Sequence, residues 1–260
     1  MSESLEKRLN EALEFIRQQR EQIARLRGRL DRLEKVVDLC FSDDDGLWLY
    51  QNREERCDPS VPIFDAERGA FHTARYLFAC DYVAGKRVLD IACGTGYGSQ
   101  LLGEQGKALE VIGIDISYEA VGYAARRHCS ANTRFLAGSA TEIPLPDHSV
   151  DVVVSFETIE HIPEDTQVIA EFARVLPSGG TLVISTPNNW PLEIAPFHTN
   201  VYDRQSFLKL LETQFSVVQL LNQNSGSSFK YNHQQPAGIV ATTDENAELA
   251  ECFIAVATKR

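Results

Sequence analysis

The stretch from Val88 to Ser99, V-L-D-I-A-C-G-T-G-Y-G-S, constrains the fold of this chain more than any other. An apolar run ends there in glycines at every second position, Gly94, Gly96 and Gly98. Continuous apolar runs are typical of strands buried on both faces, and glycine lets the backbone turn sharply and lets a ligand approach it closely. The stretch therefore predicts a strand, a glycine loop and a helix N-terminus, a unit that cradles nucleotides.

The spacing of the glycines narrows the class of ligand. The loop reads G-x-G-x-G, whereas dinucleotide-binding folds carry G-x-G-x-x-G. Asp90 lies four positions before Gly94. This pattern resembles motif I of the class I S-adenosylmethionine (SAM) methyltransferases, of the methyltransferase type 11 and quinone-biosynthesis-like kind, and further motifs extend the resemblance over residues 65–260. It implies SAM as the cofactor and S-adenosylhomocysteine as its product.

The same resemblance implies the fold class. We expect an α/β, Rossmann-like three-layer sandwich with a seven-stranded, mostly parallel sheet in the order 3-2-1-4-5-7-6. A helix is expected over Asp65–Tyr82, with Asp65 as its N-cap. The strands are expected in the following apolar stretches: 88–92, 109–116, 134–140, 150–156, 181–185, 215–222 and 251–258.

The first 40 residues carry an unbroken heptad repeat, which predicts a coiled-coil helix. The a positions are Leu9, Ile16, Ile23, Leu30 and Val37, and the d positions are Leu5, Ala12, Gln19, Leu26 and Leu33. Such a seam predicts a homo-oligomer, most simply a dimer; the alternative is a single helix folded onto its own domain. Residues 41–64 are expected to be an irregular linker after a helix stop at Ser42–Gly46, and residues 65–260 the methyltransferase domain.

Composition excludes several functions and locations. The net charge of −12 disfavours a general nucleic-acid or anionic-membrane binder, since both need a basic surface. No apolar run reaches the roughly 18 residues of a membrane span, and the charged N-terminus is unlike a signal peptide. The six cysteines form no C-x-x-C pair, and no cluster of Asp and Asn indicates a metal. We therefore expect a cytoplasmic protein without a metal site.

The resemblance assigns cofactor contacts along the strand ends. Asp115, at the end of the second strand, is expected to accept both ribose hydroxyls, and Ile116 to pack against the adenine. Ser139 stands where the family often has Asp, so its hydroxyl or the Ala140 backbone is expected at the adenine edge. The remaining expected contacts are His72 (or Arg68 or Arg75) for the SAM carboxylate, Asp90, Gly94 and Gly96 in motif I, and Phe156 and Glu157 beside the methyl donor.

The acceptor is expected to bind under residues 186–207, which hold Asn188, Trp190 and Tyr202. His161, in the E-H-I triplet, or His198 would be the base that removes the acceptor's proton; either histidine would otherwise cap or pack. Amides and aromatic rings suit a sugar, and the segment resembles methyltransferases found with bacterial glycan-assembly enzymes. The prediction is methyl transfer to an oxygen or nitrogen of a sugar or glycan-like acceptor, with a small aromatic or quinone-like metabolite as the alternative. The polar residues 222–246 are expected to form a mobile cover, with a partner surface or a disordered stretch as the alternatives.

Two other classes of function remain open. An NAD-dependent oxidoreductase needs the G-x-G-x-x-G spacing that this loop lacks. A non-catalytic scaffold would use the coiled coil for assembly and hold SAM as a structural ligand. Cofactor-specific binding separates the first from a methyltransferase, and product formation separates the second.

Overall fold

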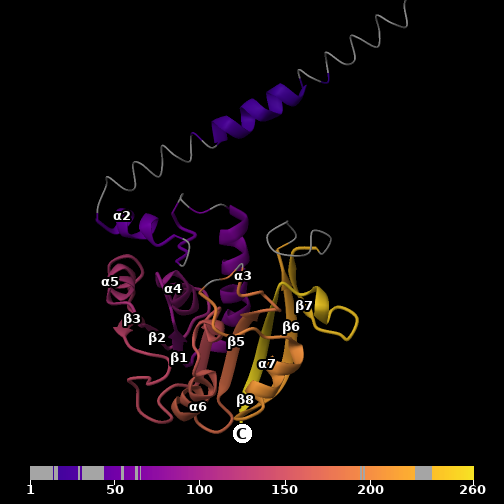
Figure 1. Cartoon of the computed structure of the whole chain (residues 1–260). Coiled ribbons are helices and arrows are strands. Elements are labelled where there is room, and N and C mark those ends of the chain that lie inside the picture. Colours follow the sequence, from indigo (N-terminus) through magenta and orange to yellow (C-terminus); the bar gives the residue numbers. More distant parts are fainter. Residues whose placement is uncertain are drawn as a thin grey trace, which may run out of the picture. The chain divides into compact units, whose positions relative to one another are not determined.

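The computed structural model describes residues 14, 17–28, 30, 44–53, 56–61, 64, 66–193, 195, 197–225 and 236–260 (Figure 1). The chain divides into two compact units. The smaller comprises Met1–Glu55 and Val61–Phe64, and the larger comprises Arg56–Ser60 and Asp65–Arg260. Within the described ranges no helix combines the length and the apolar character that crossing a membrane requires.

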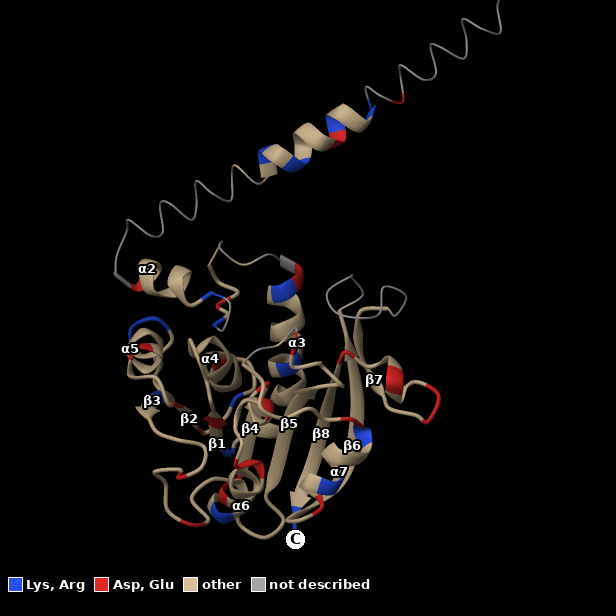
Figure 2. Cartoon of the chain, in the orientation of Figure 1, with Lys and Arg blue, Asp and Glu red and all other residues tan. Residues whose placement is uncertain are grey.

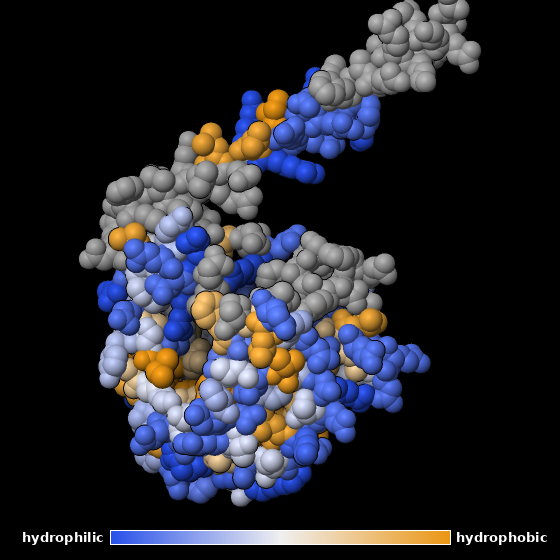
Figure 3. All heavy atoms as spheres, in the orientation of Figure 1, coloured by the Kyte–Doolittle hydropathy of each residue, from blue (hydrophilic) through white to orange (hydrophobic). Residues whose placement is uncertain are grey.

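In the smaller unit, residues 17–28 are helical, and helix α2 spans Asp44–Gln51. Ile23, Leu26 and Leu30, all heptad positions, expose 48, 54 and 56% of their surface, and hydrophobic patches appear along this helix in Figure 3. The rest of the predicted heptad stretch lies outside the described residues, as does the predicted cap Asp65. The coiled coil therefore stays a prediction.

Helix α2 corrects the prediction of an irregular linker with a stop at Ser42–Gly46. Asp45 and Gly46 lie inside the helix. Aspartate in a first turn is favourable beside the positive end of the helix dipole, and Leu49 is fully buried. Local propensity pointed to a break, but the burial of an apolar side chain outweighs it.

The larger unit contains an eight-stranded sheet in the order β3-β2-β1-β4-β5-β8-β6-β7. Strands β1 to β5 run parallel, and β8, β6 and β7 pair antiparallel. The bounds are β1 Arg87–Ile91, β2 Glu110–Asp115, β3 Thr133–Ala137, β4 Val152–Phe156, β5 Thr181–Pro187, β6 Phe215–Asn224, β7 Gly238–Ala241 and β8 Cys252–Lys259. The Rossmann-like class and the predicted order of seven strands are confirmed.

The eighth strand, β7, corrects the predicted count. It lies in the segment 222–246 that we expected to be a mobile cover, and it pairs with β6 from Asn224↔Gly238 to Leu221↔Ala241. Short, half-exposed edge strands of this kind carry little apolar signal in the sequence. Residues 226–235, between β6 and β7, lie outside the described residues, so a cover formed by them stays a prediction.

Helices cover both faces of the sheet. Their bounds are α3 Ala66–Val83, α4 Tyr97–Glu104, α5 Tyr118–Arg127, α6 Asp165–Val175 and α7 Arg204–Leu211, with short 3-10 turns η1 Ile159–His161 and η2 Ala247–Leu249. Alternate residues of each strand feed two cores: Val88 and Val152 join α3 and α4 on one face, and Leu89 and Val153 join α6 and α7 on the other. Charged side chains lie mostly on the helices and connecting segments (Figure 2). The cofactor end of the sheet is thus held by strands buried on both faces.

Candidate cofactor and acceptor site

The glycine loop turns from β1 into α4 through left-handed backbone. Gly94 and Gly96 have φ of 57° and 87°, which a residue with a Cβ adopts only at a cost. A Cβ on Gly96 would also lie 2.6 Å from the Ala124 side chain and 2.8 Å from the Phe135 ring. Packing against α5 and β3, together with the backbone conformation, therefore requires glycine at this position.

Asp115 closes β2 directly beside this loop. Its carboxylate accepts hydrogen bonds from the backbone N–H groups of Gly94 and Ser117, each at 2.9 Å. Arg56 donates to the same carboxylate at 2.8 Å, and the Asp115 side chain is only 2% exposed. Ile116, the next residue, is 72% exposed. The predicted ribose acceptor and the predicted adenine support therefore stand together at the end of β2.

Asp90 is buried beneath the loop and holds it from below. It accepts hydrogen bonds from Ser99 Oγ at 2.6 Å and from the Tyr76 hydroxyl at 3.3 Å. Burial raises the pKa of Asp90 to about 7, although both hydrogen bonds act in the opposite direction. Its partners come from α3 and α4, so Asp90 acts on the cofactor loop through the packing of these helices.

The segment Arg56–Ser60 lies against the glycine loop and α5, which the sequence analysis did not foresee. Thr95 Oγ1 donates to the Cys57 carbonyl at 2.7 Å. Asp58 is fully buried and bonds His128 Nε2 at 2.7 Å and the Tyr123 hydroxyl at 2.9 Å. Burial acts to raise the pKa of Asp58, but the hydrogen bonds from His128 and Ser60 outweigh it and hold this pKa below its ordinary value. Arg56 is thereby fixed over Asp115.

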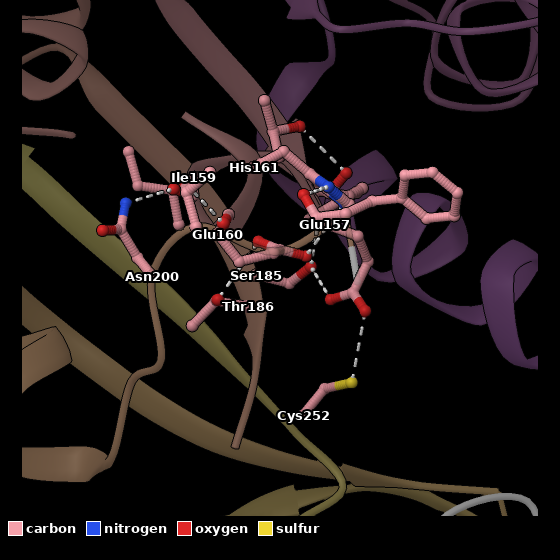
Figure 4. A network of polar contacts seen from close by, with 12 residues as sticks. Glu157, Ile159, Glu160, His161, Ser185, Thr186, Asn200 and Cys252 are labelled. Carbon is pink, nitrogen blue, oxygen red and sulfur yellow. Dashed lines mark hydrogen bonds and ion pairs between the residues drawn. The ribbon is translucent and has the colours of Figure 1, made fainter. Parts of the chain in front are cut away.

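Glu157 stands at the end of β4 in left-handed backbone, with φ of 49°. It forms an ion pair with Arg75 of α3 at 2.9 Å and accepts a hydrogen bond from Ser185 Oγ of β5 at 3.0 Å. Cys252 Sγ, from β8, lies 3.5 Å from its other oxygen. Figure 4 shows this network joining the ends of three strands. Burial is the largest influence on the pKa of Arg75 and acts to lower it, but the combined effect of Glu157 and of the weaker contributions from Cys252, Tyr97 and Glu160 keeps this pKa raised.

The two predicted base candidates lie side by side. The rings of His161 and His198 are 4.9 Å apart in an edge-to-face arrangement, and Trp190 stacks on His198 at 5.9 Å. The His161 ring nitrogen Nδ1 is 3.1 Å from the Phe197 carbonyl. One ligand atom from each of Glu160, His161 and His198 lies within 4.8 Å of the others. The predicted acceptor loop therefore does meet the residues after β4.

Other predicted residues anchor loops. Asn188 is buried and donates to the carbonyls of Ala247 and Ala250. The Tyr202 hydroxyl bonds Asp165 at 2.9 Å, and burial raises the pKa of Tyr202 well above its ordinary value.

The remaining predicted cofactor residues lie near the strand ends. Phe156 packs edge-to-face on Tyr76, with ring centres 5.0 Å apart. His72 contacts the Phe71 ring on α3, Ser139 Oγ bonds Thr141 Oγ1 at 2.7 Å, and Ala140 is buried. The cofactor contacts of these four residues stay predictions.

Three contributors were not predicted. Arg56 reaches Asp115 across 59 positions of the chain, and a separation of that size leaves no local pattern. Glu160 belongs to the E-H-I triplet, but no role was predicted for its carboxylate. Cys252 is the first residue of β8, whose first six residues are all apolar, so its sequence gives no sign of a polar contact.

Comparisons with known proteins agree with this geometry. The methyltransferase domain family matches residues 89–184. A "probable S-adenosylmethionine-dependent methyltransferase" of Mycolicibacterium smegmatis is 37% identical over 55% of this chain and 56% of its own length. A phthiotriol/phenolphthiotriol dimycocerosates methyltransferase of Mycobacterium ulcerans is 32% identical over 70% of this chain and 67% of its own length. The chain belongs to the SAM-dependent methyltransferase family.

Membership of the methyltransferase family implies SAM as the cofactor. A fatty-acid O-methyltransferase of Mycolicibacterium smegmatis is also similar, 30% identical over 54% of this chain and 52% of its own. The solved SAM-dependent methyltransferase of Mesorhizobium loti shares the fold, with a TM-score of 0.58, 15% identity, and coverage of 75% of this chain and 100% of that one. The chain spans just over half the length of curated relatives such as the probable methyltransferase of Mycolicibacterium smegmatis.

Proposed function

We propose that this methyltransferase-family chain binds SAM at the ends of β1, β2 and β4 and transfers its methyl group to an acceptor oxygen. The observation that carries the proposal is the arrangement at the end of β2. A buried carboxylate, Asp115, is fixed by the Gly94 N–H beside the exposed apolar side chain of Ile116. A diol and an aromatic base fit this pair, since carboxylates accept from ribose hydroxyls by the same logic in dinucleotide binders.

The remaining contacts to the cofactor follow from position. Gly94 and Gly96 leave the backbone open to close approach, and Ser139 and Ala140 stand at the exit of β3. Phe156 and Glu157 end β4, which neighbours β1. His72, Arg68 and Arg75, all on α3, are the candidates for the SAM carboxylate. Arg75 has the stronger claim, because its Nη2 is buried and makes no hydrogen bond to the residues that the structure describes.

The reaction needs alignment more than activation. When bound, SAM supplies a methyl group on a positively charged sulfur, which is a good leaving group. The chain's task is to hold the acceptor in line and exclude water, which is worth several orders of magnitude in rate. A hydroxyl acceptor also has to lose its proton. His161 and His198, adjacent at the end of the sheet, are the candidates to remove it.

The acceptor we favour is a hydroxyl of a sugar or glycan-like molecule. A pocket of about 480 Å³ lies where the loop after β5 meets the start of α7 and the η2 turn. Seven of the ten residues that line it are polar or charged; the ten are Asn188, Asn189, Asp203, Arg204, Gln205, Leu208, Asp244, Ala247, Glu248 and Phe253. The polar side chains of this lining suit a polyol. The name of the similar fatty-acid O-methyltransferase supports oxygen as the methylated atom. A fatty acid is therefore the second candidate, and a small aromatic or quinone-like metabolite the third.

The test is product formation. The purified chain would be incubated with SAM carrying a labelled methyl group and, separately, with a hexose or sugar nucleotide, a fatty acid and a hydroquinone. We expect label in the sugar product only, with S-adenosylhomocysteine formed in equal amount. Label in the fatty acid or in the quinol would show that the acceptor belongs to that class and not to the sugars. SAM binding without transfer to any class would favour the non-catalytic scaffold, and NAD binding would favour an oxidoreductase.

We also propose that the N-terminal helix joins two copies of the chain. Ile23, Leu26 and Leu30 repeat at spacings of three and four and are about half exposed, as in the seam of a coiled coil. Light scattering of the full chain should give the mass of a dimer. A chain beginning near Ser42 should give the mass of a monomer, and an unchanged mass would contradict the proposal.

A further inference from the structure

Glu160, His161 and His198 converge from two segments that are separate in the sequence. Glu160 and His161 belong to η1 after β4, and His198 to the loop after β5. One ligand atom of each side chain lies within 4.8 Å of the others. Two imidazoles and one carboxylate at such spacing form the ligand set of several catalytic metal centres.

The carboxylate of this cluster is held in place by the protein. Glu160 is 1% exposed, and its Oε2 accepts a hydrogen bond from Thr186 Oγ1 at 3.1 Å (Figure 4). Its backbone carbonyl accepts from the N–H groups of Thr199 and Asn200 at 2.7 and 3.0 Å. Those two bonds tie the loop that carries His198 to the turn that carries the other two side chains. Hydrogen bonds between the two segments therefore bring the three groups together, while their side chains keep room to rotate.

The hydrogen bond of His161 sets its ring in the orientation that a metal requires. Nδ1 is 3.1 Å from the Phe197 carbonyl, and a carbonyl can only accept, so Nδ1 carries the proton. In the neutral ring, the form that binds a metal, the lone pair is then on Nε2, which lies 3.9 Å from Glu160 Oε1. Metal-binding histidines almost always donate their other ring N–H to a carbonyl or carboxylate in this way. Trp190, stacked on the other imidazole, limits the rotation of that ring.

We propose that Glu160, His161 and His198 bind a divalent transition-metal ion of the zinc class, with positions left open for the acceptor. Bonds of about 2.0–2.2 Å to zinc place tetrahedral ligand atoms roughly 3.4 Å apart. The present ligand atoms lie within 4.8 Å of one another, so side-chain rotations that close each separation by at most about 1.4 Å reach that geometry. Two imidazole ligands favour zinc-class ions over magnesium or calcium, which prefer oxygen.

The ion would change how the acceptor loses its proton, and this step rests on the proposed methyl transfer. A hydroxyl bound to a metal ion is far more acidic than a free one, so its proton passes to solvent near neutral pH. The resulting oxygen, still held by the ion, forms a bond to the methyl carbon as the carbon–sulfur bond breaks. The electron pair of that bond goes to sulfur, giving the methylated acceptor and S-adenosylhomocysteine. The histidines then act as metal ligands instead of bases.

The experiment measures metal binding and SAM binding separately on the full chain. Protein freed of metal by a chelator would be titrated with ZnCl₂ by calorimetry and with CoCl₂ by visible absorption, and with SAM in a parallel sample. We expect one ion per chain and a cobalt spectrum with imidazole ligands. H161A and H198A should each weaken metal binding at least tenfold, with SAM binding within twofold of the unmodified chain. H148A, at an exposed histidine that bonds the Leu176 carbonyl, is the matched control and should change neither.

Every outcome decides the proposal. A chain that binds SAM but neither zinc nor cobalt overturns the metal site and leaves the proposed function standing. A chain that binds metal but not SAM overturns the proposed function alone. Metal binding that H161A and H198A leave unchanged, or that H148A weakens equally, places the ion elsewhere and overturns the assignment. Magnesium binding with zinc excluded would overturn the choice of ion.

Discussion

Replacing Gly98 with Ala tests how tightly the cofactor loop is packed on helix α3. An ideal Cβ at Gly98 lies 2.0 Å from Cζ of Tyr76 and 2.2 and 2.4 Å from its Cε atoms. The ring has to move by about 1.4 Å before it reaches ordinary contact at 3.4 Å. It is 7% exposed and lies edge-to-face against both Tyr97 and Phe156, so no free space takes it up.

The cost follows from these contacts. Overpacking of a buried site costs about 1–3 kcal/mol, and moving the ring also weakens the Tyr76–Asp90 hydrogen bond, worth about 1 kcal/mol. The better helix propensity of alanine offsets about 0.5–1 kcal/mol. The free energy of unfolding should therefore fall by about 1–3.5 kcal/mol, which lowers the Tm of a domain of this size by roughly 2–14 °C.

A matched variant separates packing from propensity. Gly122 also lies in a helix, α5, and its added Cβ meets only the flexible Arg126 guanidinium at 3.2 Å. Urea and thermal unfolding of G98A, G122A and the unmodified chain would be compared at one pH. G122A should keep or slightly raise the Tm. Equal unfolding midpoints for G98A and G122A would refute the packing argument, and G98A combined with Tyr76→Leu should recover part of the loss.

Two further predictions concern buried charge. Burial holds the pKa of Asp90 near 7, above its value of about 3.9 in an unfolded chain. Its contribution to stability is therefore complete below about pH 4 and is lost as pH rises to 7, by about 4 kcal/mol at most. D90N has no carboxyl to ionise, so its free energy of unfolding minus that of the unmodified chain should become more positive as pH rises from 4 to 7. A difference that does not change with pH would contradict the raised pKa of Asp90. E157Q should lower the free energy of unfolding by about 3 kcal/mol, because it leaves the buried Arg75 cation without its ion-pair partner. Arg75→Gln in the same chain should restore part of this loss, and two independent losses would show that the ion pair is not the cause.

Most of the sheet could be predicted from the sequence. The central strands are buried on both faces, so each appears as an apolar run such as Val152–Phe156. The glycine loop has its own backbone requirement, visible as the G-x-G-x-G spacing, and Asp115 follows at the end of the next run. These signals are local, and the structure places them together as expected.

The parts that could not be predicted depend on distant contacts. Arg56 and Asp58 lie in a stretch without periodicity, and their partners Asp115 and His128 follow 59 and 70 positions later. Helix α2 was missed because its acidic start resembles a turn, and β7 because an edge strand buries little. The cluster of Glu160, His161 and His198 could not be predicted, because only the folded chain brings the turn after β4 next to the loop after β5.

The central claim is that Asp115 and the glycine loop bind SAM, and calorimetry tests it most directly. Titration of the full chain with SAM should show one site per chain. Asp115→Asn removes the negative charge while keeping the shape of the side chain, and the loss of charge-assisted hydrogen bonds, worth about 1.5–3 kcal/mol, should weaken SAM binding roughly ten- to hundredfold. No heat of binding from SAM or S-adenosylhomocysteine, or equal affinity in the Asp115→Asn chain, would contradict the account.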